Sequence, residues 1–420
     1  MIRRFVASSV LLLFVSISFS GCTKASFPED YTINAIIDMC KKEYNVKVKA
    51  KVVGETLGVY IPLGSLLAND MSFKEDALTI LQDVSLSVRR VCLSTDANYN
   101  YFTVIGADRA MNIEFVMSHN TYDLRQIMLG NISRGDYVKR MTYQIRYDMQ
   151  AFGDQRIKNF FIDMSSARIE KIISNNFYPG ITLKDISSTF FLSLLELSMK
   201  DKIQFKVTYL NSMPINKDEI LYYCTVTETY EPKPEYAADM FTHPSGFVHH
   251  YLFVVTGKDA VVGIKKIFPL NAVSVSGTES VAFPEEYAQY DNVAEWDKNN
   301  FYIRDISKPY FLANQIAQRI RNRVTEEGVV SLESIDGSYV NLDPQSEKEE
   351  DLELVLKVKD KGEITKDMTR KVLRTFIDVS ITVYKQVCKD YKFHDFKKIT
   401  IFDANNKVLF TIDKVMLKTK

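Results

Sequence analysis

The sequence predicts an α+β fold of repeated modules, in which helices pack on small antiparallel sheets. Three observations lead to this prediction. Short segments in which apolar and polar residues alternate follow one another through tight turns, as antiparallel strands do. Segments with apolar residues at helical spacing flank them. Two distant stretches of the 420-residue chain also match each other in the same order, which indicates two copies of one module.

The internal match has two parts. Residues 58–63 match residues 337–342, and further along the chain residues 83–88 match residues 378–383. A cysteine, Cys92 in the first copy and Cys388 in the second, then follows at almost the same offset. Because the order of helix and strand signals around the matches is also similar, we interpret the two stretches as diverged repeats.

The N-terminus has the features of an export signal. Arg3 and Arg4 precede an apolar stretch of about 15 residues, which is shorter than the roughly 20 residues that span a bilayer. The following Phe19-Ser20-Gly21-Cys22 resembles the lipobox of bacterial lipoproteins, although Phe19 stands where that family usually has leucine. The resemblance implies a signal peptide at residues 1–21 and acylation of Cys22. The alternative is an ordinary secretory signal, with Cys22 merely the residue that follows it.

The resemblance also implies a location. Residues 22–29 would be a lipidated tether, and the body would lie in the periplasm of a bacterial cell envelope. Acyl chains such as palmitate on Cys22 would attach the protein to the membrane, and each buried CH₂ would contribute about 0.8 kcal/mol to the free energy of binding. Thr23 follows the cysteine where aspartate would retain the protein at the inner membrane, so the family pattern favours the outer membrane.

The first module is expected at residues 30–118. A helix at about 33–40 precedes a strictly alternating strand at 46–52, and a second strand follows at 59–63. A capping box formed by Ser72 and Glu75 opens a second helix that runs to about Cys92. A hairpin then closes the module; its strands are expected at 101–105 and 111–116.

The centre of the chain is expected to hold a divergent module at 177–269. A mainly helical connector at 119–176 leads into it, and a linker with little periodicity follows at 270–305. Within the module we expect a deeply buried helix and four strands. Their ranges are 181–199 for the helix and 203–210, 220–229, 247–255 and 260–268 for the strands.

The last module, at residues 306–420, is interpreted as the repeat of the first. Its expected helices are 311–324 and 369–391. Its expected strands are 329–334, 339–342, 398–402 and 408–412, with an additional alternating strand at 352–358. No glycine-rich βαβ crossover is present, so a Rossmann-type sheet is not expected.

Composition and motifs exclude several function classes. The 53 basic and 53 acidic residues balance, whereas a dedicated nucleic-acid binder is usually basic. Removal of residues 1–21 takes away two of the basic ones and leaves a formal charge of −2. The chain has no Walker loop, no His-Glu-x-x-His and no Gly-x-Ser-x-Gly. Besides Cys22 we expect four free, buried thiols and no cofactor; an envelope location leaves disulfides as the alternative.

The candidate for metal chemistry is a group of three histidines, His243, His249 and His250. Four carboxylates precede them: Glu228, Glu231, Glu235 and Asp239. Imidazole and carboxylate are suitable zinc ligands. In a strand, however, His249 and His250 point to opposite faces. A turn at His243 that leads into a strand is therefore the competing interpretation.

Two groups of basic residues have two readings each. The group Lys47, Lys49 and Lys51 could attract anionic surfaces, but we favour a role in protecting an edge strand from unwanted pairing. The group Lys308, Arg319, Arg321 and Arg323 could contact lipid phosphate or an acidic partner. Because Arg321 does not share the helical face of Arg319 and Arg323, we favour a solvated helix.

These observations lead to one functional hypothesis and two alternatives. The first is a membrane-anchored, non-enzymatic lipoprotein that serves as an interaction or assembly scaffold for envelope proteins. The second is a carrier of a lipid or hydrophobic ligand, because the 23 Tyr and 26 Phe could line an apolar pocket. The third is a metal-dependent hydrolase that uses residues 243–250.

Overall fold

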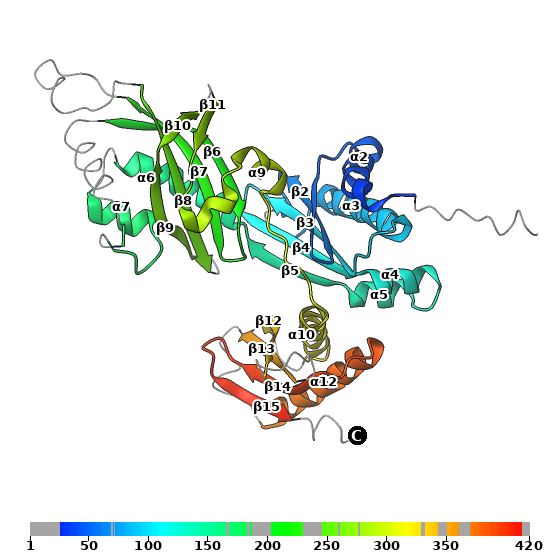
Figure 1. Ribbon diagram of the computed structural model, residues 1–420. Helices are drawn as coiled ribbons and strands as arrows, with labels where there is room; N and C mark the ends of the chain where they lie inside the picture. The colour runs from blue at the N-terminus through cyan, green and yellow to red at the C-terminus, as the bar shows by residue number, and fades with distance from the viewer. Residues whose placement is uncertain are drawn as a thin grey trace, which may run out of the picture.

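The computed structural model confirms the α+β class. It describes residues 26–68, 70, 72–164, 168–182, 185–186, 203–229, 246–258, 261–275, 278–328, 332–342, 351–360 and 370–413. Three sheets carry the fold: the N-terminal sheet (β1–β5), the middle sheet (β6–β9) and the C-terminal sheet (β12–β15). Helices cover each of them (Figure 1).

The N-terminal sheet belongs to a helix–strand–strand–helix–strand–strand unit. Its elements are α2 (Thr32–Tyr44), β1 (Lys49–Val53), β2 (Thr56–Leu63), α3 (Glu75–Ser94), β3 (Tyr101–Asp108) and β4 (Ile113–Asn120). The hairpins β1–β2 and β3–β4 are antiparallel, whereas β2 pairs with β3 in parallel. The parallel pair arises because α3 carries the chain back across the sheet between these two strands.

The C-terminal sheet belongs to a unit with the same order of elements. They are α10 (Lys308–Glu326), β12 (Leu332–Asn341), β13 (Leu352–Asp360), α12 (Arg370–Asp390), β14 (Phe396–Phe402) and β15 (Val408–Asp413). Again two antiparallel hairpins flank one parallel pair, β13–β14. The expectation of wholly antiparallel sheets is therefore wrong for these two sheets, because a helix separates the middle strands of each.

The structure changes the register of the repeat. Residues 83–88 in α3 and 378–383 in α12 do lie in corresponding helices, the second helix of each unit. Residues 58–63, however, lie in β2, the second strand, while the stretch that they match begins in β12, the first strand. The second strand of the last unit is β13, which the sequence had suggested as an addition.

Both matched stretches begin with a glycine, and each glycine has its own contact. The sequence predicted separate strands at 329–334 and 339–342, but β12 runs through Gly337 without interruption. A Cβ at Gly337 would lie 2.1 Å from the carbonyl oxygen of Ala313, so the glycine lets α10 approach the strand. A Cβ at Gly58 would instead meet the side chain of Ile303 at 1.8 Å. The two glycines serve different contacts.

The middle sheet is an antiparallel meander. Its strands are β6 (Gln204–Pro214), β7 (Glu219–Thr229), β8 (Val248–Lys258) and β9 (Val261–Leu270). Two helices, α6 (Met149–Met164) and α7 (Ile169–Asn176), pack on one face. Rings of Phe160 and Phe161 meet Phe253 there at centroid distances of 5.9 Å and 5.7 Å. Most of the helix expected at 181–199 lies outside the described residues.

The expected helical connector is divided between two sheets. It contains α4 (Thr121–Met128), α5 (Arg134–Arg140) and β5 (Thr142–Tyr147), and it ends with α6 and α7. Strand β5 was not expected; it pairs with β4 and becomes an edge of the N-terminal sheet. The connector is thus part of two packed units rather than a separate segment.

Residues 270–305 are also packed rather than a simple linker. They form β10 (Ala272–Val275), β11 (Thr278–Val281), η2 (Glu285–Tyr290), η3 (Val293–Glu295) and α9 (Trp296–Asn299). Phe283, Tyr287 and Trp296 cover the second face of the middle sheet, against Leu252 and Val254. Because these residues are irregularly spaced, periodicity did not indicate their burial.

The chain then crosses the N-terminal sheet. Phe301 and Ile303 pack on the face of that sheet opposite α2 and α3. The side chain of Asp305 accepts hydrogen bonds from the N–H of Glu55 at 3.2 Å and from the hydroxyl of Thr56 at 3.3 Å. The turn between β1 and β2 is therefore held by a residue about 250 positions away.

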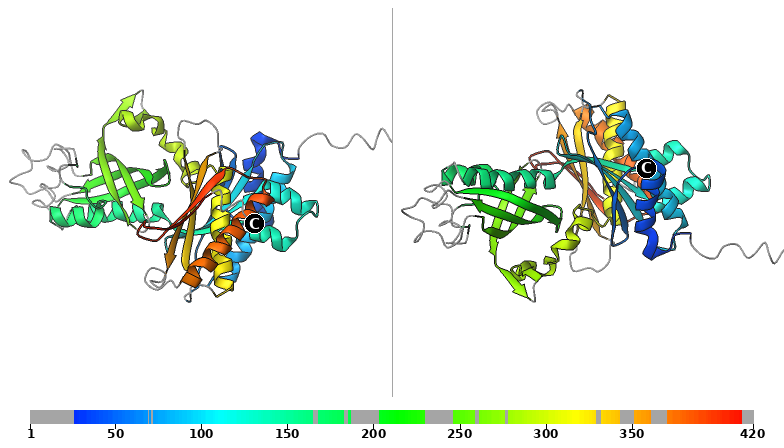
Figure 2. Two further views of the ribbon diagram at one scale, coloured as in Figure 1. Left: turned by 90° about the horizontal axis from the view of Figure 1, so that it is seen from below. Right: turned by 90° about the horizontal axis from the view of Figure 1, so that it is seen from above.

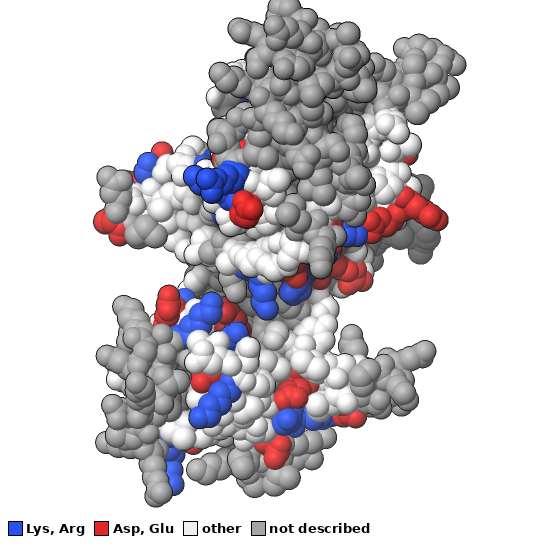
Figure 3. Space-filling view, turned by 90° about the vertical axis from the view of Figure 1, so that its left-hand side faces the viewer, with Lys and Arg blue, Asp and Glu red and all other residues white. Residues whose placement is uncertain are grey.

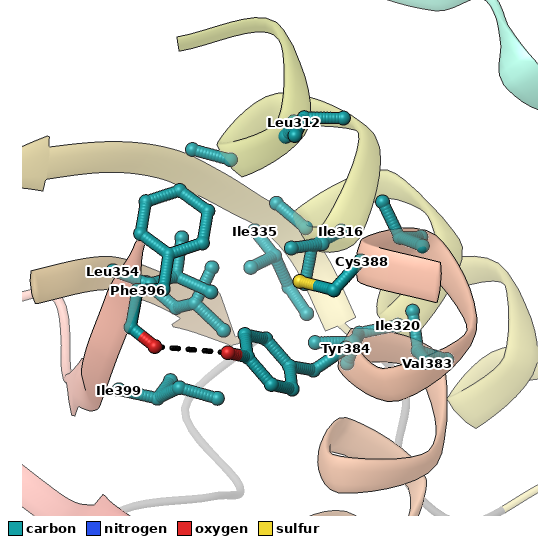
Figure 4. Packing of buried hydrophobic residues seen from close by; sticks show 14 of the residues in the cluster. Leu312, Ile316, Ile320, Ile335, Leu354, Val383, Tyr384, Cys388, Phe396 and Ile399 are labelled. Carbon is teal, nitrogen blue, oxygen red and sulfur yellow. Dashed lines mark hydrogen bonds between the residues drawn. The ribbon is translucent and has the colours of Figure 1, made fainter. Parts of the chain in front are cut away.

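Helix α10 lies between the N-terminal and C-terminal sheets (Figure 1). Its inner side joins the core of the C-terminal unit, and Phe311 meets Tyr101 of β3 at a centroid distance of 5.2 Å. Figure 2 shows α10 beside α12, on one face of the C-terminal sheet. Within that core the hydroxyl of Tyr384 donates to the carbonyl of Phe396 at 2.9 Å (Figure 4).

The four cysteines of the described residues are buried and unbridged, as the sequence predicted. They are Cys40, Cys92, Cys224 and Cys388. Burial raises the pKa of Cys92 and of Cys388 to about 12. Across the part of the chain that the structure describes, no helix has both the length and the apolar character needed to cross a bilayer.

Candidate functional site

One candidate site is a cleft of about 630 Å³ where the three units meet, which we call the central cleft. Its walls come from β5, from the β6–β7 turn, from the segment around Tyr302 and Arg304, and from the ends of β12 and β13. In Figure 3 the two lobes of the molecule are separated by a hollow, and Lys and Arg side chains lie along its rims beside Asp and Glu.

One wall of the central cleft is organised by Arg146 on β5. Its Nε donates to Glu114 at 2.6 Å, and its Nη2 donates to the carbonyl of Tyr302 at 3.1 Å. Burial raises the pKa of the Glu114 carboxyl, and the guanidinium of Arg146 opposes this rise. Arg146 therefore fixes β5 against the segment around Tyr302, and its pairing with Glu114 leaves little net charge on that wall.

A second cation, Arg304, has a different setting. Its guanidinium lies over the ring of Tyr310, 4.2 Å from the centroid. Among the described residues no carboxylate lies within ion-pair distance of Arg304. Burial lowers its pKa, but the neighbouring Tyr310 and Tyr302 outweigh this effect and raise the pKa. Arg304 is thus a stacked, partly buried donor group whose charge a ligand could neutralise.

A second cleft of about 570 Å³, the lateral cleft, lies between the N-terminal sheet and α6. It shares Asp148 and Gln150 with the central cleft and also contains Arg109, Asp154 and Lys158. Burial raises the pKa of Asp154 to about 6, with Lys158 opposing the rise and Asp148 adding to it. A carboxyl that titrates near neutral pH in a cleft is suited to binding or proton transfer.

Asp148 is held by the start of α6. Its Oδ1 accepts from the N–H of Ala151 at 3.1 Å, so the side chain caps the helix. Burial raises its pKa, against the effect of the backbone donors. The hydroxyl of Tyr222 donates to the carbonyl of Gln150 at 2.6 Å and fastens the same helix turn to the middle sheet.

Gly153 makes that attachment possible. A Cβ at this position would lie 2.3 Å from the hydroxyl oxygen of Tyr222. The absence of a side chain therefore allows the tyrosine to reach under the helix. Both clefts depend on this contact, because it sets the position of the residues that they share.

The candidate histidines do not converge. His249 lies on the α6 side of β8, where its Nε2 meets Glu228 Oε2 at 2.6 Å in a buried pair. His250 lies on the opposite face, where its Nδ1 and the hydroxyl of Tyr223 are 2.7 Å apart. The sequence prediction of opposite faces is therefore confirmed. His243 lies outside the described residues, as do Glu231, Glu235 and Asp239, and no metal-binding group of three is found in the described part.

The basic groups singled out in the sequence are exposed only in part: Lys47, Lys308 and Arg321 are exposed, whereas other members are covered. Lys49 donates to the side chain of Asn300 at 2.6 Å, and Lys51 lies 4.8 Å from the ring centroid of Phe301. Burial lowers the pKa of Lys51 to about 8. β1 is an edge strand, as the protective reading requires, but two of its lysines lie under the segment that follows α9. Arg319 is likewise turned inward, 3.7 Å from Asp390.

Arg319 belongs to a buried polar network that joins the N-terminal and C-terminal units. Arg140 pairs with Asp123 at 3.0 Å and with Asp390 at 3.3 Å. Tyr391 donates to the second oxygen of Asp123. Gln315 of α10 donates to the carbonyl of Arg140 at 2.6 Å and to the hydroxyl of Tyr391 at 3.0 Å. The network holds the N-terminal and C-terminal units together, and both units contribute walls to the central cleft.

Sequence reasoning missed the two clefts and this network. Each residue in them is ordinary in its local context, and only the packing of distant segments brings the group together. The one local signal was the alternation of residues 142–147, which predicts a strand with Arg146 on one face. Cys22 and its signal lie outside the described residues, so the lipidation site remains a prediction.

Comparison of the chain with protein-family models, with curated proteins and with solved structures finds no match. The site must therefore be interpreted from its own geometry.

Proposed function

We propose that this chain is a lipid-anchored protein of the bacterial cell envelope and that it acts as a non-enzymatic interaction scaffold. The observation that carries the proposal is the central cleft, whose walls come from all three units. A site composed in this way presents groups from distant parts of one chain to a single partner. Clefts between domains are common binding sites.

The contacts between the units support a rigid scaffold. Besides the Asp123–Arg140–Tyr391 network, Gln318 of α10 accepts from the N–H of Tyr143 at 3.0 Å and donates to the carbonyl of Met141 at 3.2 Å. The backbone at the start of β5 and just before it thus bonds to a side chain of α10. A preformed surface loses little conformational entropy when a partner binds.

Two observations favour the scaffold over the alternatives. The aromatic face of the middle sheet is packed against α6. Phe160 and Phe161 of α6 and Tyr251 of β8 are among the buried residues of this interface. This packing supports a structural role for the aromatic residues rather than a ligand-carrying one. The separation of His249 and His250 on opposite faces of β8 gives a hydrolase no shared metal at these two positions.

The anchor is proposed from Cys22 and the residues before it. Growth with a radioactive fatty acid should label the chain, and Cys22→Ser should abolish the label. Fractionation should place the labelled protein with the outer membrane. Equal labelling of the Cys22→Ser chain would remove the anchor from the proposal.

Site-directed photo-cross-linking in cells tests the scaffold itself. p-Benzoylphenylalanine in place of Tyr302, in the central cleft, should capture a defined envelope protein from the anchored, full-length chain. The matched control replaces Leu86, which is 45% exposed on α3, away from the cleft. Absence of any discrete product at Tyr302, or the same products at both positions, would contradict the proposal.

A further inference from the structure

Strand β5 is a free edge within the central cleft. The sheet ends at β5, and the N–H of Asp148 donates to the carbonyl of Asn112 at 2.8 Å. In an antiparallel pair, residues that bond to the neighbouring strand alternate with residues whose N–H and C=O point away. Since Asp148 bonds toward β4, Gln144 and Arg146 do so too. The backbone groups of Tyr143, Ile145 and Tyr147 therefore point outward.

The outward groups are only partly used. The N–H of Tyr143 donates to Gln318 Oε1 at 3.0 Å, which closes the edge at that end. For Ile145 and Tyr147, no partner for the outward N–H or C=O is found among the described residues. Both residues line the central cleft. About four backbone hydrogen-bonding groups are thus presented to it.

The side chains of this edge do not protect it. Tyr143, Ile145 and Tyr147 are 43%, 57% and 46% exposed. Edge strands of soluble proteins are usually blunted by lysine, proline or a bulge, because free backbone groups pair with other chains. The opposite edge, β1, carries lysines and is covered by the residues after α9. β5 has neither lysine nor proline.

The surroundings favour a single extended segment as the occupant. A second copy of the sheet edge would have to enter between the β6–β7 turn and the end of β12, which flank β5 in the cleft. An extended peptide needs only the spacing of about 4.8 Å between paired strands. On the other face of β5, Arg304 stacks on Tyr310 without a carboxylate partner among the described residues.

We infer that an extended segment of a partner protein adds to the free edge of β5 as a further strand. The inference rests on the proposed scaffold function and names the mode of recognition. The backbone of Ile145 and Tyr147 supplies the hydrogen bonds. Alternate residues of the segment are apolar, beside these two side chains, and acidic, toward Arg304. The bound stretch is short, because Gln318 blocks the edge at Tyr143 and α6 begins at Met149.

A backbone substitution tests this inference. A random heptapeptide library displayed on phage is selected against the full chain, and synthetic copies of the selected peptides are measured by titration. Ile145→Pro removes the outward N–H without touching a bond to β4, and should weaken binding at least tenfold. Ile145→Ala is the matched control, since it also loses the side chain but keeps the N–H, and should weaken binding by less than threefold.

A second measurement does not depend on how the proline variant folds. With p-benzoylphenylalanine in place of Tyr147, the selected peptides should cross-link to the chain, and with the same group in place of Leu86 they should not. Selection of no binding peptide, equal weakening by Ile145→Pro and Ile145→Ala, or no cross-link at position 147 would overturn the inference.

The two proposals fail separately. If cells yield a cross-linked partner at Tyr302 while Ile145→Pro leaves its capture unchanged, the scaffold stands and strand addition is wrong. If no envelope partner is captured from cells at all, the scaffold is wrong, whatever the peptides do.

Discussion

The hydroxyl of Tyr391 donates a hydrogen bond to the carboxylate of Asp123, although 268 positions separate the two residues. The contact joins the loop after α12 to α4, and Arg140 holds the other oxygen of the same carboxylate at 3.0 Å. Burial raises the pKa of Asp123, against the effects of Tyr391 and Arg140. The N-terminal and C-terminal units are thus connected through a buried carboxylate that needs both partners.

Tyr391→Phe should therefore destabilise the junction. The variant removes one donor from a buried carboxylate, which typically costs about 1–3 kcal/mol. The free energy of unfolding in urea should fall by that amount. Tyr143→Phe, at a half-exposed position, is the control and should change it by less than about 0.5 kcal/mol. Equal stability of the two variants would contradict the role assigned to the network.

Gly153→Ala should destabilise the chain because its Cβ would lie 2.3 Å from the hydroxyl oxygen of Tyr222. Overpacking of this kind costs about 1–3 kcal/mol, measurable as a lower unfolding midpoint. Gly135→Ala in α5 is the matched control, because the nearest atom to its Cβ would be 3.8 Å away. It should be neutral or slightly stabilising. A Gly153→Ala chain as stable as this control would show that Tyr222 is free to move.

Asp154 should make stability depend on pH. Its pKa in the folded chain is about 6, above the usual 3.8, so the folded state binds more protons than the unfolded state between these values. Stability from this group is therefore present at low pH and is lost as the pH rises through 6. The midpoint temperature of thermal unfolding of Asp154→Asn, minus that of the native chain, should therefore increase as the pH rises from 4 to 7.

The control for this prediction is Asp96→Asn, at an exposed position. The difference in midpoint temperature between Asp96→Asn and the native chain should stay constant over the same pH range. If the difference in midpoint temperature between Asp154→Asn and the native chain also did not change with pH, the Asp154 carboxyl would be better solvated than its position suggests.

The buried thiols should resist labelling. In a Cys22→Ser chain, a disulfide reagent at pH 8 should react with fewer than one thiol per native molecule, because Cys92 and Cys388 are buried with pKa values near 12. In guanidinium chloride, all four remaining cysteines should react. Fewer than four thiols after unfolding without reductant would reveal a disulfide instead.

Local patterns predicted the class of fold and much of its secondary structure. Alternation and helical spacing depend on which side of an element is buried, and β1, α3 and α10 show that dependence clearly. The same patterns failed where burial has no period. Trp296 and Phe301 are buried by the surfaces of sheets formed elsewhere in the chain, so nothing near them in sequence marks their role.

The candidate site was even less accessible to sequence reasoning. The opposite orientation of His249 and His250 follows from strand geometry alone and was predicted. The meeting of Arg146 with Tyr302 depends on how the crossing segment lies on the N-terminal sheet, and no local pattern encodes that path. Gly337 lies inside β12, where two separate strands were predicted, and its lack of a side chain lets a helix come close to the strand.

The hydrogen bonds of Asp305 to the β1–β2 turn have a consequence for folding during synthesis. The first unit reaches its final form only after residue 305 has left the ribosome. Until then Tyr60, Ile105 and Val116 lack the cover of Phe301 and Ile303. Contacts of such long sequence separation slow folding. The emerging chain therefore exposes an apolar sheet face until residues 301–305 have been made, and a truncation before residue 301 should leave that face exposed.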